Sequence, residues 1–149
     1  MSQCIIIDPC LFRVGGHEYA MNEFLSAQAI ASGYDPLVLC NNQFQQQATF
    51  PYRALFTYSP YASTGVSPQK DKELFIFGNR DIYSMLQKNI PIEKVEKHSM
   101  ILIHTACATI LGGIARWLNL STRTDLKIRI VLRWGAAQRH FSVKIGTKL

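Results

Sequence analysis

Short, unbroken apolar runs alternate with segments of helical periodicity along much of the chain. Residues 4–7 form one such run, residues 36–40 form a second, and residues 100–104 form a third that ends in His104. Unbroken apolar runs of this length are typical of parallel strands that are covered on both faces of a sheet. The residues after the first and the third run, 17–32 and 105–118, have the spacing of amphipathic helices. The pattern therefore predicts two strand–loop–helix units.

Each predicted helix has one apolar stripe, which we expect to face the sheet. In the first helix this stripe consists of Ala20, Met21, Phe24, Ala27 and Ala31. The polar residues expected to face elsewhere are Glu18, Asn22, Glu23 and Ser26. In the second helix the inward residues are Ile110, Leu111, Ile114, Trp117 and Leu118. Gly33 follows the first helix, and we expect it to end that helix in the left-handed conformation.

The remaining segments give a less regular pattern. Residues 53–58 favour a third strand, and the alternation of residues 127–133 predicts a strand with one partly wet face. Residues 58–72 contain Pro60, Gly65 and Pro68 and are expected to form a long loop. Residues 72–87 mix helix and strand signals, so no element type is assigned to them.

These elements predict an α/β fold. We expect an open, mainly parallel, Rossmann-like sheet of about five strands with helices on both faces. Residues 1–133 would form this domain, and residues 134–149 would form an irregular basic tail. The chain is 48% hydrophobic and 17% charged, which indicates an ordered globular protein.

The net charge of +6 restricts the class of binding partner but does not identify one. It favours phosphate-bearing ligands, acidic membrane surfaces or nucleic acid. The basic residues are scattered and are not interleaved with stacking aromatics, so nucleic-acid binding is not expected. The four cysteines form no Cys-x-x-Cys pair and predict no metal site. The N-terminus does not resemble a signal peptide, so we expect a cytoplasmic protein with free thiols, with peripheral membrane association as an alternative.

Two loops follow buried strands and enter helices, and both are candidate binding sites. They span residues 8–16 and 104–108, at the strand ends where open α/β sheets bind ligands. Gly15 and Gly16 match neither the Gly-x-Gly-x-x-Gly fingerprint nor a Walker loop, so no nucleotide cofactor is expected. The pair either forms a turn that needs positive φ or lets a ligand approach the helix N-terminus.

Several side chains near these loops have both a functional and a structural interpretation. His104 could hydrogen-bond a ligand hydroxyl, hold a proton or be a satisfied core histidine. Arg133 could contact an anion at the same edge or be an ordinary surface arginine. Asp8 could be an acid at the edge of the site or the start of an Asp-Pro turn. Cys107 has only His104 as a nearby base, which makes a thiol enzyme a weak hypothesis.

Two segments together resemble a known family. "IIIDPCLFRVGGHEYAMNEFLSAQAIASGYDPLVLC" and the later "MILIHTACATILGGIARWL" resemble the N-terminal half of GT-B glycosyltransferases of the retaining, family 4-like group. The resemblance implies that Gly15, Gly16 and His17 lie at the donor diphosphate or the acceptor. It also implies that His104 lies near the transferred sugar as the catalytic residue, with Thr105 and Arg133 as further substrate contacts.

The resemblance further implies transfer of a sugar from a nucleotide-sugar donor to a sugar or lipid acceptor, without a metal held by an Asp-x-Asp motif. Such enzymes need a second Rossmann-like domain, which supplies most of the nucleotide pocket. We therefore expect this chain to be the acceptor-side half, inactive alone, and to require a missing C-terminal domain or a partner chain. Homo-oligomerisation is another way to cover the exposed apolar face that such a half would have. The alternative function is a non-catalytic Rossmann-like module that binds a sugar or a phosphate compound.

Overall fold

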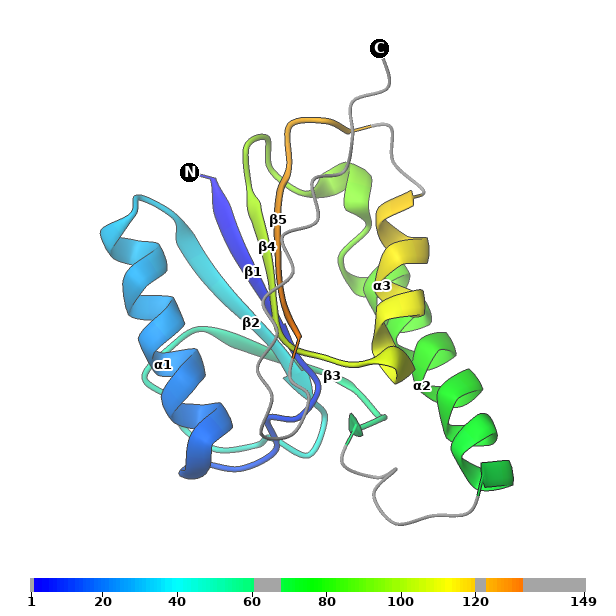
Figure 1. Ribbon diagram of the computed structural model, residues 1–149. Coiled ribbons are helices and arrows are strands. Elements are labelled where there is room, and N and C mark those ends of the chain that lie inside the picture. The colour runs from blue at the N-terminus through cyan, green and yellow to red at the C-terminus, as the bar shows by residue number, and fades with distance from the viewer. Residues whose placement is uncertain (1, 61–67, 120–122, 133–149) are drawn as a thin grey trace.

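Five parallel strands form one open sheet in the order β3-β2-β1-β4-β5 (Figure 1). The computed structural model describes residues 2–60, 68–119 and 123–132. The strands are β1 Gln3–Asp8, β2 Asp35–Asn41, β3 Tyr52–Phe56, β4 Met100–Ala106 and β5 Lys127–Leu132. The prediction of an open, parallel, Rossmann-like sheet of about five strands is confirmed.

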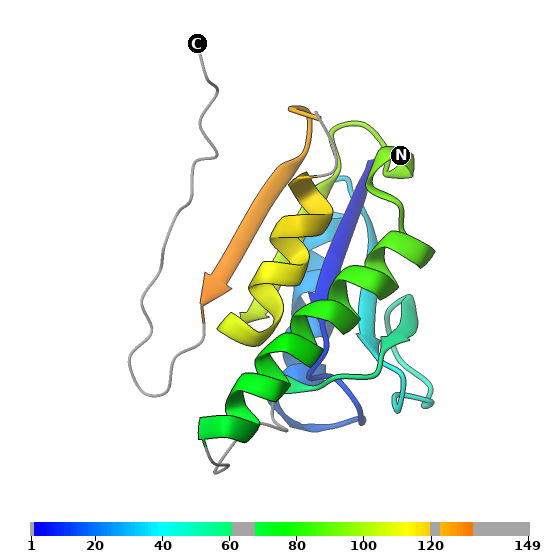
Figure 2. The ribbon, with the colours of Figure 1, turned by 90° about the vertical axis from the view of Figure 1, so that its right-hand side faces the viewer.

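The helices cover both faces of the sheet, as predicted. Helix α1, Gly16–Ala31, lies on one face and joins β1 to β2. Helices α2, Pro68–Asn89, and α3, Ala108–Asn119, lie side by side on the other face (Figures 1 and 2). Residues 72–87, which the sequence left unassigned, belong to α2, and this helix begins at Pro68, inside the segment 58–72 that was expected to form a loop. A short 3₁₀ helix, η2 Ile92–Lys94, precedes β4.

Strand order reverses between β1 and β4. The chain runs outward from β1 through β2 to β3, and then crosses by α2 to β4 on the other side of β1. Ligands of open α/β sheets bind at the carboxyl ends of the strands where the order reverses. In this protein that position is the edge where β1 and β4 end.

Side chains of the central strands alternate between two cores. Ile5, Ile7, Ile101 and Ile103 are fully buried in the core under α2 and α3. Trp117 of α3 is also fully buried there, and its indole N–H donates to the carbonyl oxygen of Ile90 at 2.9 Å. The five α3 residues predicted to face inward are buried or half-buried, which confirms that part of the helical pattern.

The first helix packs with a different face from the one predicted. Its buried residues are Asn22, Ser26 and Ala29, whereas Phe24, Ala20 and Ala27 are exposed. Phe24 retains 58% of its accessible surface. The predicted inward stripe is therefore wrong, and polar side chains of α1 lie against the sheet.

Helices α2 and α3 cross at a very short distance because small residues meet there. A Cβ atom on Gly113 would lie 2.3 Å from the carbonyl oxygen of Asn79, and one on Gly78 would lie 2.5 Å from that of Thr109. The Asn79 side chain spans the crossing, since its Oδ1 accepts the Gly113 N–H at 2.8 Å and its Nδ2 donates to the Ala108 carbonyl oxygen at 3.2 Å. The crossing thereby fixes α3, and with it the end of β4.

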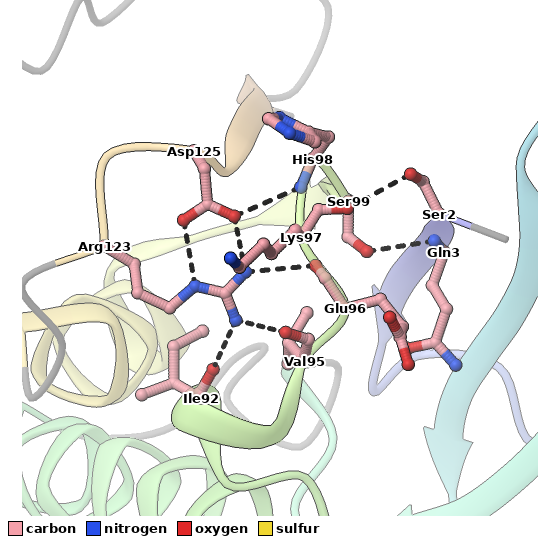
Figure 3. A network of polar contacts seen from close by, with 10 residues as sticks. All are labelled: Ser2, Gln3, Ile92, Val95, Glu96, Lys97, His98, Ser99, Arg123 and Asp125. Atoms are coloured by element: carbon pink, nitrogen blue, oxygen red, sulfur yellow. Dashed lines mark hydrogen bonds and ion pairs between the residues drawn. The ribbon is translucent and has the colours of Figure 1, made fainter.

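A separate polar network joins the connections at the amino ends of the strands (Figure 3). The Arg123 guanidinium pairs with Asp125 at 2.6 Å and also donates to the carbonyl oxygens of Ile92, Val95 and Glu96. This pairing raises the pKa of Arg123 and lowers that of Asp125, in both cases chiefly through the hydrogen bond between the two side chains. The network lies at the opposite edge from the candidate site and acts as a structural anchor.

Two predictions lie outside the described residues: the position of Arg133 and the irregular tail at 134–149. Within the described part of the chain, no helix is long and apolar enough to cross a membrane.

Candidate functional site

A buried polar cluster lies at the carboxyl ends of β1 and β4. Asp8 is the last residue of β1, His104 and Thr105 lie near the end of β4, and Asn22 is on the second turn of α1. All four side chains are buried, Asp8 and Asn22 completely. Three elements that are distant in sequence thus bring one carboxylate, one imidazole, one amide and one hydroxyl together.

Asp8 is the centre of the cluster. Its Oδ1 accepts hydrogen bonds from the Cys10 backbone N–H at 3.0 Å and from the Thr105 hydroxyl at 3.1 Å. Its Oδ2 accepts one from Asn22 Nδ2 at 2.5 Å and lies 3.2 Å from His104 Nε2. A buried carboxylate is costly unless its oxygens are paired, and these four contacts offset that cost. The contact with Cys10 is also the Asp-Pro turn that the sequence indicated.

His104 has two neighbours at the same ring nitrogen. Its Nε2 lies 3.2 Å from Asp8 Oδ2 and 3.3 Å from Asn22 Oδ1. The side chain retains only 5% of its surface. The histidine is therefore held in one orientation at the strand end by groups from β1 and α1.

Two cysteines close to the Asp8 carboxylate, Cys10 and Cys40, have raised pKa values. Burial, and then the negative charge of Asp8, raise the pKa of Cys10 well above its usual range. The same two causes raise the pKa of Cys40 to about 12. Thiolates are the nucleophilic form of cysteine, so neither thiol is suited to covalent catalysis at neutral pH.

The double-glycine loop lies at the N-terminus of α1. Gly15 is the N-cap residue, with φ 82° and ψ 168°, and Gly16 has φ 79°. Both conformations are disfavoured for residues with a side chain, so the turn interpretation of the pair is supported by the backbone itself. A Cβ atom on either residue would meet no atom of the described residues within 4 Å, so these residues leave the space next to the two glycines open. Val14 N–H donates to Gln46 Oε1 at 2.6 Å, which ties the loop to the connection after β2.

Two further polar residues fix the other strand ends at this edge. Asn41, at the end of β2, donates to the carbonyl oxygens of Pro9 at 3.4 Å and Tyr58 at 3.3 Å. Asp81 of α2 accepts from the Thr57 hydroxyl at 2.6 Å and from the Tyr58 backbone N–H at 3.0 Å. The loops around the candidate site are therefore held by side chains from neighbouring elements.

The structure brings some of the predicted site residues together and leaves others apart. His104 and Thr105 share the Asp8 cluster, with the Thr105 hydroxyl directed at Asp8. Gly15, Gly16 and His17 are exposed at the N-terminus of α1, where Gly15 is the N-cap residue and Gly16 and His17 are the first helical residues. The loop and the cluster are linked through α1, where Asn22 Nδ2 also donates to the Glu18 carbonyl oxygen at 2.8 Å.

Sequence reasoning missed Asn22 and understated Asp8. Asn22 was expected to face away from the sheet, and Asp8 was considered only as an edge acid or a turn starter. The one available signal was that Asp8 ends a buried strand, which places it at the ligand-binding edge. Nothing in the local pattern pointed to Asn22, because its partners come from β1 and β4.

The arrangement can bind hydroxyl-bearing ligands more readily than anions. A buried carboxylate beside the imidazole disfavours a second negative charge nearby. Among the described residues, no three His, Cys, Asp or Glu side chains are placed to hold a metal ion together.

Fold and site together define a Rossmann-like α/β domain with a buried polar cluster at the point where strand order reverses. No family model, curated protein or solved structure matches the chain.

Proposed function

We propose that the protein is a carbohydrate-binding Rossmann-like domain, the acceptor-side half of a GT-B glycosyltransferase. In this proposal a sugar or lipid-linked sugar acceptor binds at the carboxyl edge of β1 and β4. A second nucleotide-binding domain or a partner chain supplies most of the nucleotide-sugar pocket. The single observation that carries the proposal is the buried Asp8–His104 pair at the switch point, beside the open double-glycine loop.

The chemistry of this edge supports a neutral polyhydroxyl ligand. Hydroxyl groups can both donate and accept hydrogen bonds, so they suit an imidazole that is itself oriented by a carboxylate. The exposed backbone of Gly15 and Gly16 adds polar groups without side chains in the way. Glycosyl transfer also needs exclusion of water and orientation of the donor, which a single wall does not provide. We therefore expect binding without turnover from this chain alone.

A specific observation favours the alternative, a phosphate-binding module. The N-terminus of α1 begins at the double-glycine loop, and helix N-termini bind anions through free N–H groups. The buried Asp8 carboxylate and Glu18 in the first turn of α1 weigh against this alternative, because both place negative charge near the loop.

Part of α2 supports a peripheral location on a cytoplasmic membrane surface. Phe75, Ile76 and Phe77 are consecutive and each keeps about half of its surface exposed. A groove of about 390 Å³ between α2 and α3 is lined by Ile76 together with Arg80 and Arg116. Exposed apolar residues beside cations suit an anionic bilayer surface. Co-sedimentation with phosphatidylglycerol vesicles, compared with phosphatidylcholine vesicles, tests this, and equal binding to both or to neither contradicts it.

The exposed side of α1 offers a surface for the second domain or for a second copy of the chain. Phe24 and Ile30 are its large exposed apolar residues, at 58% and 62% exposure. Sedimentation velocity of the full chain and of a Phe24→Glu variant measures self-association. An unchanged monomer in both contradicts the second-copy arrangement.

The proposed function is tested by ligand binding. Isothermal titration with UDP-glucose, GDP-mannose, methyl α-glucoside and methyl α-mannoside should detect at least one sugar ligand. His104→Gln should weaken that binding about tenfold or more, since a buried hydrogen-bond partner of the ligand is altered. His98→Asn is the matched control, because His98 is an exposed histidine at the opposite edge with φ 60°, a conformation that asparagine tolerates. Robust hydrolysis of a nucleotide sugar by this chain alone would overturn the expectation of binding without turnover.

A further inference from the structure

The amide of Asn22 has only one orientation that satisfies its surroundings. Asp8 Oδ2 at 2.5 Å and the Glu18 carbonyl oxygen at 2.8 Å lie at the same end of the amide. Both atoms are acceptors, so this end must be the NH₂ group. The amide oxygen is then fixed at the other end, where it lies 3.3 Å from His104 Nε2.

His104 Nε2 therefore faces two acceptors. One is Asn22 Oδ1 and the other is the Asp8 carboxylate oxygen at 3.2 Å. A ring nitrogen without a proton would direct its lone pair at both oxygens, which is repulsive, whereas an N–H group donates to both. In a histidine, the hydrogen bond made by one ring nitrogen decides the state of the other.

We infer that Asp8 and Asn22 are positioning residues that hold His104 as the Nε2–H tautomer, so that the neutral ring offers Nδ1 as a hydrogen-bond acceptor. The two nitrogens of an imidazole point in nearly opposite directions, so Nδ1 faces away from Asp8. The group that this nitrogen recognises is a hydrogen-bond donor, such as the hydroxyl of a neutral sugar or polyol. It does not recognise an unprotonated phosphate or carboxylate oxygen, which would meet a lone pair. This assignment of the ligand's chemistry rests on the proposed function, whereas the tautomer rests on the Asp8 cluster alone.

The tautomer can be read directly by long-range ¹H–¹⁵N correlation of the histidine rings in the full ¹⁵N-labelled chain. The spectrum is recorded near pH 8, above the ordinary histidine pKa of about 6.5. His104 is assigned by the loss of its signals in His104→Gln. We expect at least about a tenfold excess of the Nε2–H form, as a hydrogen bond to a charged acceptor would give. The exposed His17 and His98 should show averaged signals and serve as internal references.

Two variants separate positioning from mere packing. Asp8→Asn should reduce the tautomer excess several-fold, because a neutral amide is a weaker acceptor and places an NH₂ group among donors. Ser26→Ala should leave it unchanged, since Ser26 lies one turn further along the buried face of α1 and its hydroxyl has no hydrogen-bond partner among the described residues. An Nδ1–H or averaged pattern in the wild-type chain overturns the inference, whether or not Asp8→Asn folds. An unchanged excess in folded Asp8→Asn overturns the role of Asp8.

The ligand part is tested separately with the same samples. Methyl α-glucoside, methyl α-mannoside and inorganic phosphate are titrated in turn while the His104 Nδ1 resonance is observed. A shift with a glycoside and none with phosphate supports hydroxyl recognition. A shift with phosphate alone overturns it. An Nε2–H pattern with no response to any sugar supports the tautomer and contradicts the proposed function, so the two failures are distinguishable.

Discussion

Removing the Asp8 carboxylate is the perturbation that most clearly measures what the buried cluster contributes to stability. Asp8→Ala takes away the acceptor of four buried donors. Two of these keep another acceptor: Asn22 still donates to the Glu18 carbonyl oxygen, and His104 still faces Asn22 Oδ1. The Cys10 N–H and the Thr105 hydroxyl have no other oxygen acceptor within the described part of the chain.

The expected magnitude follows from these two orphaned donors. A buried donor that loses its partner costs roughly 1–3 kcal/mol. Two of them give a loss of about 4 kcal/mol in the free energy of unfolding, a large share of the roughly 5–15 kcal/mol that stabilises a typical domain. Thr105→Val removes one donor and its hydrogen bond together, and should cost only about 1 kcal/mol.

Urea unfolding followed by far-UV circular dichroism measures these differences. The midpoint should fall in the order wild type, Thr105→Val, Asp8→Ala with an unchanged dependence on urea, which marks a change in stability rather than in compactness. Ser26→Ala is the control on the same face of α1. It should be neutral or slightly stabilising, because it deletes a buried hydroxyl that has no hydrogen-bond partner in the part of the chain that the structure describes. A loss below about 1 kcal/mol for Asp8→Ala would refute the assignment of Asp8 as the centre of the cluster.

Three further predictions concern the loop, the thiols and the amino edge. Gly15→Ala should cost about 1–3 kcal/mol in urea unfolding, because its φ and ψ lie in a region that is nearly exclusive to glycine; wild-type stability would contradict this. Alkylation by iodoacetamide near pH 8 should modify half-buried Cys107 well before Cys10, whose raised pKa and burial keep it a thiol; mass spectrometry of the modified peptides decides the order. Asp125→Asn should lower the melting temperature at neutral pH, and by a clearly smaller amount near pH 2, because Arg123 lowers the pKa of Asp125 in the folded state. That stability is fully present above the ordinary carboxyl pKa of about 4 and declines as the pH falls from there towards the lowered pKa of the folded state; a difference that does not vary with pH contradicts the pairing.

The strands could be predicted because their signal is local. Ile5, Ile6 and Ile7 form a continuous apolar run, and such a run has few alternatives to a strand that is buried on both faces. Helix α3 was predictable for the same reason, since one stripe carries nearly all its large apolar residues and becomes its buried face. The parallel direction of the strands and the two helical layers then follow from the strand–helix connections and their right-handed crossovers, whereas the strand order comes from the structure alone.

Helix α1 shows where local pattern fails. It carries apolar residues on more than one side, so its own sequence does not determine which face is buried. The side chains of the sheet that it packs against determine that face. Asp8 and His104 of the sheet lie on that face, and Asn22 is the α1 residue that forms hydrogen bonds with both of them. Asn22 and His104 are 82 positions apart in the sequence, so the periodicity within the helix could not predict that they are in contact.

Helix α2 shows a second kind of limit. Phe75, Ile76 and Phe77 form a β-like apolar run, yet they lie within a 22-residue helix. Residues outside this run stabilise the helix through tertiary hydrogen bonds: Asp81 binds the loop after β3, and Asn79 binds α3. Tertiary contacts thus override the local preference of the run.

The most direct test of the proposed function is a map of ligand contacts on the full chain. Backbone amide shifts are followed while methyl α-glucoside, methyl α-mannoside, UDP-glucose and GDP-mannose are titrated in turn. The account predicts that at least one of them shifts the amides of Gly15, Gly16 and His104 together, and that His104→Gln reduces the response. No response at this edge to any of the four, or a response centred at the amino ends of the strands near Asp125, would contradict it.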